Sequence, residues 1–107
     1  MVKNIYFVEI PYSNFSKVKG RPILIFKELE NDYLYLPLTS NLSRSGVLLN
    51  GYDLENGILK KESIIIVPKI SAIDKNLIVQ GRLIGTLKEN KFDEVVLKIC
   101  NSLGCIK

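Results

Sequence analysis

An arginine, a threonine and a serine have the spacing that brings polar side chains together at one end of a hairpin. Arg21 stands directly before Pro22 and an apolar run, and Thr39 and Ser40 end the next apolar run. Antiparallel pairing about the centre of the polar segment 30–32 places Pro22 opposite Ser40, which puts Arg21 at the same end as both hydroxyl side chains. A planar guanidinium beside hydroxyl groups suits a phosphate. The alternatives are a solvated arginine at a strand start and two turn-forming hydroxyl residues.

Other basic residues could extend this predicted phosphate corner. Lys17 and Lys19 lie in a loop predicted over 11–20, Arg44 lies in the polar loop 40–46, and Lys69 follows Pro68. Long loops in small domains often carry function. We therefore expect these side chains to contact an anionic ligand together with Ser40, although ordinary solvated side chains would give the same pattern.

The residue types that are missing exclude several kinds of chemistry. The chain has no histidine, so histidine acid–base catalysis and Cys–His nucleophiles are excluded. The two cysteines, Cys100 and Cys105, have no second Cys pair and cannot form an ordinary zinc site. Glycine-rich phosphate loops and zinc-protease motifs are also missing. We expect no metal and no cofactor.

Composition and charge are those of a small folded protein with an anionic partner. The chain has 107 residues, 47% hydrophobic and 24% charged, so we expect residues 1–107 to form a single domain. The net charge of +4 favours nucleic acid or an acidic protein segment as partner. No secretion signal and no long apolar run is present, which predicts a cytoplasmic protein without a membrane partner.

The apolar pattern predicts short strands followed by one helix. Strands are expected over 4–10, 21–29, 33–40, 47–50 and 63–70, with extended structure over 71–85 and a long loop over 51–63. Pro22 fits only the first position of a strand, and Pro37 and Pro68 indicate irregularities. Asp74 is expected to cap a turn near 74–76.

The C-terminal segment has the pattern of an amphipathic helix. Thr86 and Glu89 have the spacing of a capping box, and Gly104 is a suitable stop. One apolar stripe follows at helical spacing, made of Phe92, Val95, Val96, Ile99 and Leu103. The predicted fold class is therefore mainly β with a C-terminal α-helix, in the form of a curled antiparallel sheet that the helix caps.

Four segments in this order resemble the MazF/PemK family of toxins from type II toxin–antitoxin systems. They are VEIPYSNFSKVKGRPILIF, LPLTSNLSR, GILKKESIIIVPKISAIDKNLI and RLIGTL, and they cover nearly the whole chain. The resemblance implies a small SH3-like barrel of the MazF/PemK/CcdB type, a homodimer, and metal-independent, sequence-selective cleavage of single-stranded RNA. The arginine of the family's RP motif and the threonine of its PLTS-type motif match Arg21 and Thr39, which makes these the expected catalytic residues. An acidic antitoxin is the expected protein partner.

The segment 66–71 departs from the pattern of this family. Lys69 and Ser71 stand where members often carry Gln and Arg, and Ile66 and Pro68 stand where some carry Arg and an acidic residue. Two further interpretations stay open. The barrel could bind RNA, an antitoxin or a protein target such as gyrase without strong nuclease activity, as the related CcdB toxins bind gyrase. It could also be an interaction module outside toxin biology.

Overall fold

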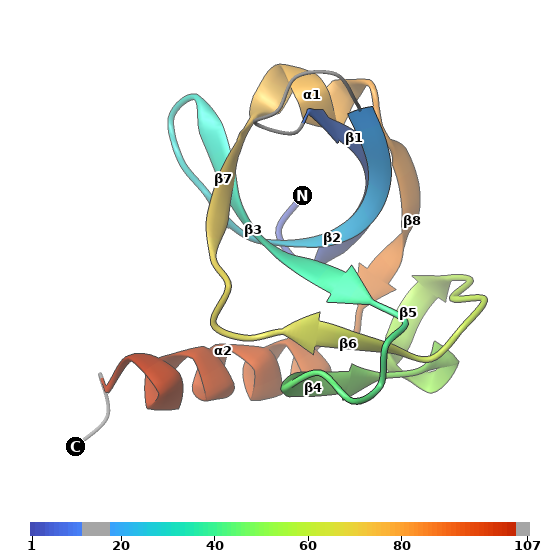
Figure 1. Ribbon diagram of the computed structural model, residues 1–107, viewed down its shortest axis with the longest axis vertical. Coiled ribbons are helices and arrows are strands. Elements are labelled where there is room, and N and C mark those ends of the chain that lie inside the picture. Colours follow the sequence, from blue (N-terminus) through green and yellow to red (C-terminus); the bar gives the residue numbers. More distant parts are fainter. Residues whose placement is uncertain (12–17, 105–107) are drawn as a thin grey trace.

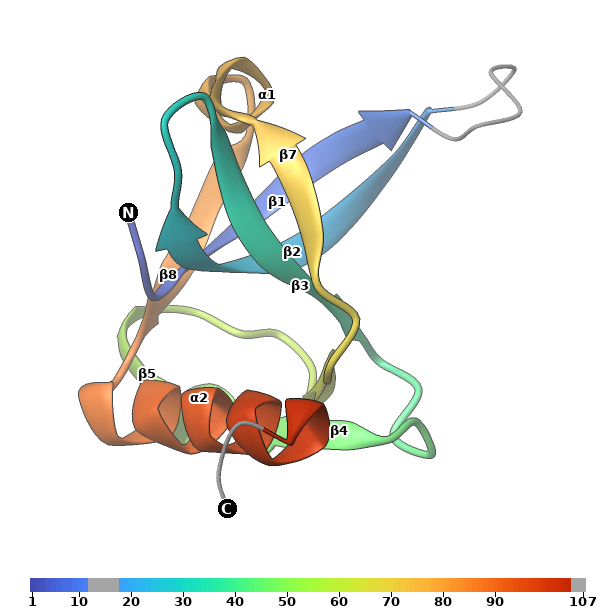
Figure 2. The ribbon, with the colours of Figure 1, turned by 90° about the vertical axis from the view of Figure 1, so that its left-hand side faces the viewer.

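The chain forms a curled antiparallel sheet with one long helix beneath it (Figures 1 and 2). The computed structural model describes residues 1–11 and 18–104, and only the backbone of residues 11, 18 and 19 within them. The strands of these ranges are β1 (Asn4–Pro11), β2 (Val18–Glu28), β3 (Asp32–Thr39), β4 (Gly46–Leu49), β5 (Leu54–Gly57), β6 (Ser63–Ile66), β7 (Ser71–Asp74) and β8 (Arg82–Leu87). The helices are the 3-10 turn η1 (Gly51–Asp53), α1 (Lys75–Val79) and α2 (Glu89–Leu103). The predicted fold class, mainly β with a C-terminal helix, is confirmed.

The strands follow the order β4-β6-β3-β2-β1-β8-β5, and β7 pairs with β3 outside this path. Strand β3 takes part in both halves of the curl because it changes neighbours at Pro37. Its last pair with β2 is Ile23 with Pro37, and its next residues, Leu38 and Thr39, pair with β6. The irregularity predicted at Pro37 is therefore the corner at which the sheet bends.

Two details of the predicted hairpin are wrong. Strand β2 begins at Val18, so Pro22 lies inside the strand, where it pairs with Phe7 of β1. A proline is tolerated there because β2 has already lost its β3 partner. The pairing of β2 with β3 is also two residues from the predicted register, with Ile23 opposite Pro37, and a bulge follows at 25–27. The same count carried beyond this last pair matches Arg21 with Thr39, but there Arg21 pairs with Val8 of β1 and Thr39 with Ile64 of β6.

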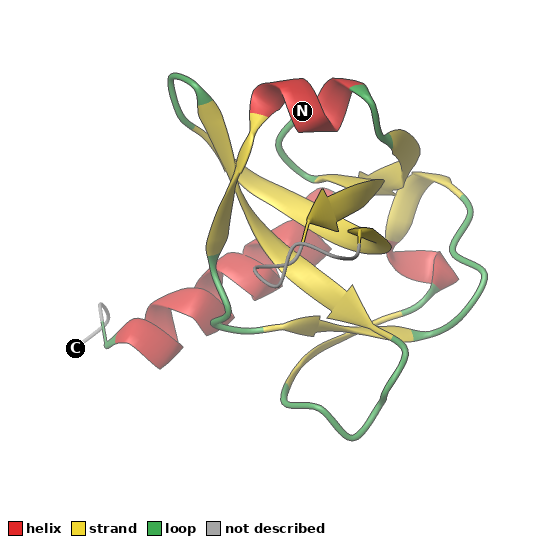
Figure 3. Cartoon of the chain, turned by 45° about the horizontal axis from the view of Figure 1, so that its top comes forward, coloured by secondary structure: helices red, strands yellow, loops and turns green. Residues whose placement is uncertain are grey.

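Two clusters of buried apolar side chains form the core. The larger cluster lies between the sheet and the layer of β4, β6 and α2, and Ile5, Leu24, Leu36, Ile65 and Val95 are at its centre. The smaller cluster lies inside the curl of β1, β2, β3 and β7, which α1 closes at one end (Figure 3). The burial of these aliphatic side chains is the main contribution to the stability of the fold.

The segment 51–63, predicted as one loop, contains the turn η1 and the short strand β5. Asn50 caps η1 by accepting a hydrogen bond from the N–H of Tyr52. Gly57 of β5 pairs with Gly85 of β8, and an added Cβ at Gly57 would lie 2.2 Å from the carbonyl oxygen of Ile84. Two glycines without side chains let these backbones approach, which no apolar periodicity could indicate.

The predicted helix boundaries need two corrections. The turn expected at 74–76 is the start of α1, whose N-cap is Asp74. The predicted capping box does not form, because Thr86 belongs to β8 and donates its hydroxyl hydrogen to Asn4 Oδ1 at 2.8 Å. Lys88 occupies the N-cap of α2 without a side-chain bond, and Gly104 ends the helix in the left-handed region as predicted.

Along α2, only part of the predicted stripe is covered. Val95 and Ile99 are buried and Phe92 packs against the larger core, while Val96 and Leu103 are exposed. Cys100 lies in the helix as expected, and Cys105 lies outside the described residues. Over the described helices, none is both long enough and apolar enough to cross a membrane.

Candidate functional site

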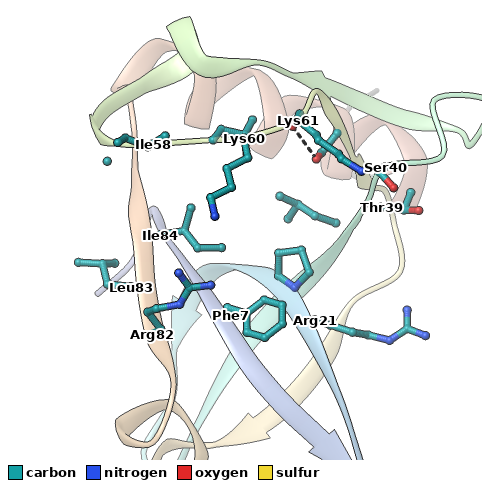
Figure 4. Close-up of a pocket in the computed structure, with 15 residues that line it drawn as sticks. Phe7, Arg21, Thr39, Ser40, Ile58, Lys60, Lys61, Arg82, Leu83 and Ile84 are labelled. Atoms are coloured by element: carbon teal, nitrogen blue, oxygen red, sulfur yellow. Dashed lines mark hydrogen bonds between the residues drawn. The ribbon is translucent and has the colours of Figure 1, made fainter.

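A groove of about 790 Å³ opens between the two halves of the molecule (Figure 4). One wall is made by outward-facing residues of β1, β2 and β8, and the other by the segment 57–61 that leads from β5 toward β6. The end of β3 closes one side. The groove therefore lies where the curled sheet and the lower layer separate.

The groove forms because the face of β1 that is buried at the start of the strand is exposed to solvent further along it. Ile5 is fully buried in the larger core, whereas Phe7, two residues further on, is 37% exposed and lines the groove. Alternate residues of a strand point to the same face, so Phe7 continues the face that Ile5 begins. An exposed aromatic side chain in a hollow is a feature of binding surfaces.

Arg21, Thr39 and Ser40 all line this groove. Figure 4 shows Arg21 and Thr39 on the same side of it, with the polar ends of both side chains directed outward on that side. Thr39 Oγ1 accepts a hydrogen bond from the N–H of Asn41 at 3.2 Å. This bond holds the hydroxyl in place, uses only a lone pair and leaves its hydrogen for donation to a ligand.

The turn after Thr39 is stiffened by further local bonds. Asn41 Oδ1 accepts from the N–H of Ser43 at 3.1 Å and from its hydroxyl at 2.7 Å. The N–H of Arg44 in turn donates to the carbonyl oxygen of Asn41. Thr39 therefore takes part in a turn, as one of the alternatives predicted, and both Thr39 and Ser40 line the groove.

Of the other basic residues predicted to contact a ligand, the two whose side chains are described, Arg44 and Lys69, lie outside this lining. Arg44 is exposed in the loop before β4, and Lys69 is exposed between β6 and β7; neither lines the groove. Lys17 and the side chain of Lys19 lie outside the described part of the chain. In the segment that departs from the family pattern, Ile66 is buried and Ser71 pairs with Tyr35.

Three basic groove residues were not singled out by the sequence. Lys60 and Arg82 extend into the groove from opposite walls, and Lys61 extends toward Ser40 (Figure 4). The Arg82 guanidinium lies over the ring of Phe7, 5.5 Å from its centroid. Arg82 could have been noticed in the sequence, because it directly precedes an apolar run, as Arg21 does.

The charges around the groove have one sign. Among the described residues that line it, Arg21, Lys60, Lys61 and Arg82 are basic and no carboxylate is present. The described part of the chain also contains no group of three or more cysteine or carboxylate side chains that could hold a metal ion. Positive charge with hydroxyl donors and apolar floor residues suits a phosphate backbone with attached rings.

The chain was compared with known protein families and with curated proteins. A family model described as PemK-like, MazF-like toxin of type II toxin-antitoxin system matches residues 2–103. No curated protein matches the chain significantly.

Proposed function

Because the chain belongs to the family of PemK-like, MazF-like toxins of type II toxin–antitoxin systems, we propose that it is a toxin that cleaves single-stranded RNA. The observation that supports this function is the groove itself. It places Arg21 and Thr39 on one side of a hollow that is lined by three further cations and by exposed apolar residues. We propose that this groove holds the RNA and that cleavage is selective for sequence.

The chemistry we propose is attack of a ribose 2′-hydroxyl on the adjacent phosphorus. The 2′ oxygen forms a new bond to phosphorus, the bond to the 5′ oxygen breaks, and a 2′,3′-cyclic phosphate results. Water accepts the proton of the attacking hydroxyl and supplies one to the leaving oxygen. The Arg21 guanidinium stabilises the extra negative charge of the transition state, and the Thr39 hydroxyl donates to a phosphate oxygen. Four groove cations supply the positive charge that a metal ion supplies in other nucleases.

The test is cleavage of a long single-stranded RNA in the presence of a chelator. We expect Arg21→Ala to lose about two to three decades of cleavage rate, because one donor to the developing charge is gone. Lys27→Ala removes one positive charge from an exposed position outside the groove lining and should cleave at the wild-type rate. Folding of each variant is checked by circular dichroism.

Two outcomes of this assay would contradict the proposal. A folded wild-type protein that binds RNA and leaves it intact would favour a binding module instead. A protein that neither binds nor cleaves RNA would favour a toxin with a protein target such as gyrase, or an interaction module.

The partner in such a system is an antitoxin. We propose that the antitoxin is acidic and covers the groove, since its carboxylates would meet the four groove cations. In a titration, a bound antitoxin should then release RNA from the groove in a one-to-one ratio. Simultaneous binding of both would show that the antitoxin acts elsewhere.

We also propose that the toxin is a homodimer in the cytoplasm. Exposed apolar side chains gather on α2, where Val96, Leu97 and Leu103 are 38%, 53% and 59% exposed. Covering these side chains with a second copy removes apolar surface from water. Leu97→Glu should shift the protein toward the monomer in sedimentation experiments, while Tyr52→Glu, at an exposed site on η1 rather than on α2, should not.

A further inference from the structure

The Phe7 ring contacts both strands that neighbour β1. An added Cβ on Gly20 of β2 would lie only 2.4 Å from Cε1 and Cζ of Phe7, so this edge of the ring packs against Gly20, which has no side chain to block it. From β8, the Arg82 guanidinium lies over the same ring. Phe7 pairs in register with both Pro22 and Arg82, which fixes its position in the middle of the sheet.

A second hollow of about 210 Å³ adjoins the groove, and the side chains of Phe7 and Arg82 lie between the two. Phe7 and Arg82 line both the groove and the second hollow, and the remaining residues of the second hollow are Glu9, Leu77 and Gln80. Its size is that of a single planar ring rather than a peptide or a folded partner. Glu9 lies two residues after Phe7 on β1, so its side chain points to the same face.

We propose that this second hollow binds one unpaired nucleobase of the RNA and selects it by its exocyclic amino group. This inference rests on the proposed function and adds a base-specificity site to it. The RNA backbone would follow the basic groove, and one base would turn over Phe7 and Arg82 into the second hollow. Phe7, Arg82, Glu9 and Gln80 form the base pocket.

The chemistry of the base pocket supports this role. Aromatic and guanidinium planes are the two surfaces on which unstacked bases of single-stranded RNA are bound, and here both are present in one pair. Leu77 provides an apolar side to the pocket. The Glu9 carboxylate accepts hydrogen bonds only, and it fits the amino group of cytosine, adenine or guanine. Uracil presents carbonyl oxygens and one ring N–H, so the pocket disfavours it.

The charges agree with a base rather than a phosphate in this pocket. A phosphate would be repelled by Glu9, and in the groove no carboxylate of the described residues opposes it. Arg82 lies between the two hollows, and its positive charge offsets the repulsion between Glu9 and the phosphates of an RNA backbone in the groove. Gln80 can both donate and accept, which allows it to read a second position on the edge of the base.

The test of the stacking surface is binding of a short RNA whose 2′-hydroxyls are methylated, so that it cannot be cut. Phe7→Ala should weaken binding about tenfold, since one stacking surface is lost. Phe7→Leu, which keeps apolar bulk, should weaken it nearly as much, and Phe7→Tyr should restore it. Tyr52→Ala is the matched control, because Tyr52 is an 87% exposed aromatic residue outside both hollows.

The test of the base selection is the relative cleavage of RNAs that differ at one position. Wild type should cut sequences with an amino-bearing base at one fixed position about tenfold faster than the same sequence with uracil. Glu9→Gln should reduce this preference with little change in the rate on the poorer substrate, and Glu55→Gln, an exposed strand residue outside both hollows, should leave it unchanged.

The outcomes separate this inference from the proposed function. If wild type cleaves RNA but Phe7→Leu matches Phe7→Tyr and Glu9→Gln keeps the preference of wild type, the base pocket is wrong and the nuclease stands. If wild type neither binds nor cleaves RNA, both proposals are wrong.

Discussion

At the scale of single residues, the Thr39 hydroxyl has two separable tasks. It accepts a hydrogen bond from the N–H of Asn41 and, in the proposed reaction, it donates to a phosphate oxygen. Thr39→Ser keeps both bonds and should cleave RNA within a few-fold of wild type. Thr39→Val has nearly the same shape and loses both, so its cleavage rate should fall by about two decades.

A second measurement on Thr39 separates the reaction from the turn. The free energy of unfolding of Thr39→Val should fall by about 1 kcal/mol, the usual contribution of one hydrogen bond. Thr39→Val with the cleavage rate of wild type and the same loss of stability would show that the hydroxyl serves only the turn.

Groove residues could be predicted from the sequence only where the local pattern of apolar runs and turns indicates their position. Arg21 and Thr39 were found because Arg21 begins one apolar run and Thr39 ends the next. Counting residues outward from the turn at 30–32 predicted their proximity, although the register was two residues off. Lys60 and Arg82 were not found, because they meet only when β5 and β8 approach, and no local pattern marks that approach. Phe7 was predicted only as part of a strand, since a sequence does not show where one face of a sheet is no longer covered by other elements.

At the scale of elements, the close approach of β5 and β8 depends on Gly57. Its φ of +91° is strained for any other residue, and an added Cβ would meet backbone atoms of Ile84 and Gly85 within 2.5 Å. Gly57→Ala should therefore lower the free energy of unfolding by about 2 kcal/mol or more in urea titrations. Because Gly57 lines the groove, the same variant should bind RNA more weakly.

Gly51→Ala is the matched control for this backbone prediction. A Cβ at Gly51 has no neighbouring atom within 4 Å, and this glycine lies in the turn just before β5. Its unfolding free energy should stay within about 0.5 kcal/mol of wild type. Equal stability of the two alanine variants would show that the strands can separate without cost.

Strands with many buried side chains were easier to predict than the short elements between them. The apolar runs located β1, β3, β4 and β6, because a buried strand needs apolar side chains wherever it pairs. Strand β5 was predicted as loop and helix α1 as extended structure after a turn, because each has only one buried side chain, Leu54 in β5 and Ile78 in α1. Elements that contribute so little to the core leave almost no periodic signal.

Helix α1 is tied to the sheet by an ion pair whose pH dependence can be measured. Lys75 Nζ lies 2.8 Å from Glu28 Oε2. The hydrogen bond from Lys75, with its charge, lowers the pKa of the Glu28 carboxyl, and the same bond raises the pKa of Lys75. The pair therefore stabilises the fold above the usual carboxyl pKa and below the usual lysine pKa. Its contribution is lost as the pH falls through the lowered pKa of Glu28, or rises through the raised pKa of Lys75.

Glu28→Gln should thus be slightly less stable than wild type at neutral pH, and the difference should vanish in strong acid. The effect is small because both groups are solvent-exposed. Urea unfolding across the acid range measures it, with Glu30→Gln as a control of equal charge change in the adjacent turn. A difference that persists below the carboxyl range would assign the effect to packing rather than to the ion pair.

At the scale of the whole molecule, the net charge of +4 matters less than where the charges lie. Arg21, Lys60, Lys61 and Arg82 all line one groove, whereas other lysines, such as Lys27 and Lys98, are exposed elsewhere. Binding of single-stranded RNA releases about 0.7 counterion for each phosphate that a cation neutralises. If each groove cation neutralises one phosphate, log affinity should fall with log salt with a slope of about −3.

Two double variants of equal net charge test this arrangement. Lys60→Ala with Lys61→Ala removes two groove cations and should make the slope shallower by about 1.4, because two fewer phosphates are neutralised. Lys27→Ala with Lys98→Ala removes two charges outside the groove and should leave the slope as in wild type. The measurement is fluorescence anisotropy of a labelled, uncleavable RNA between low and physiological salt. Equal slopes in the two double variants would mean that RNA responds to the overall charge of the protein, and the groove would then no longer be the RNA-binding surface.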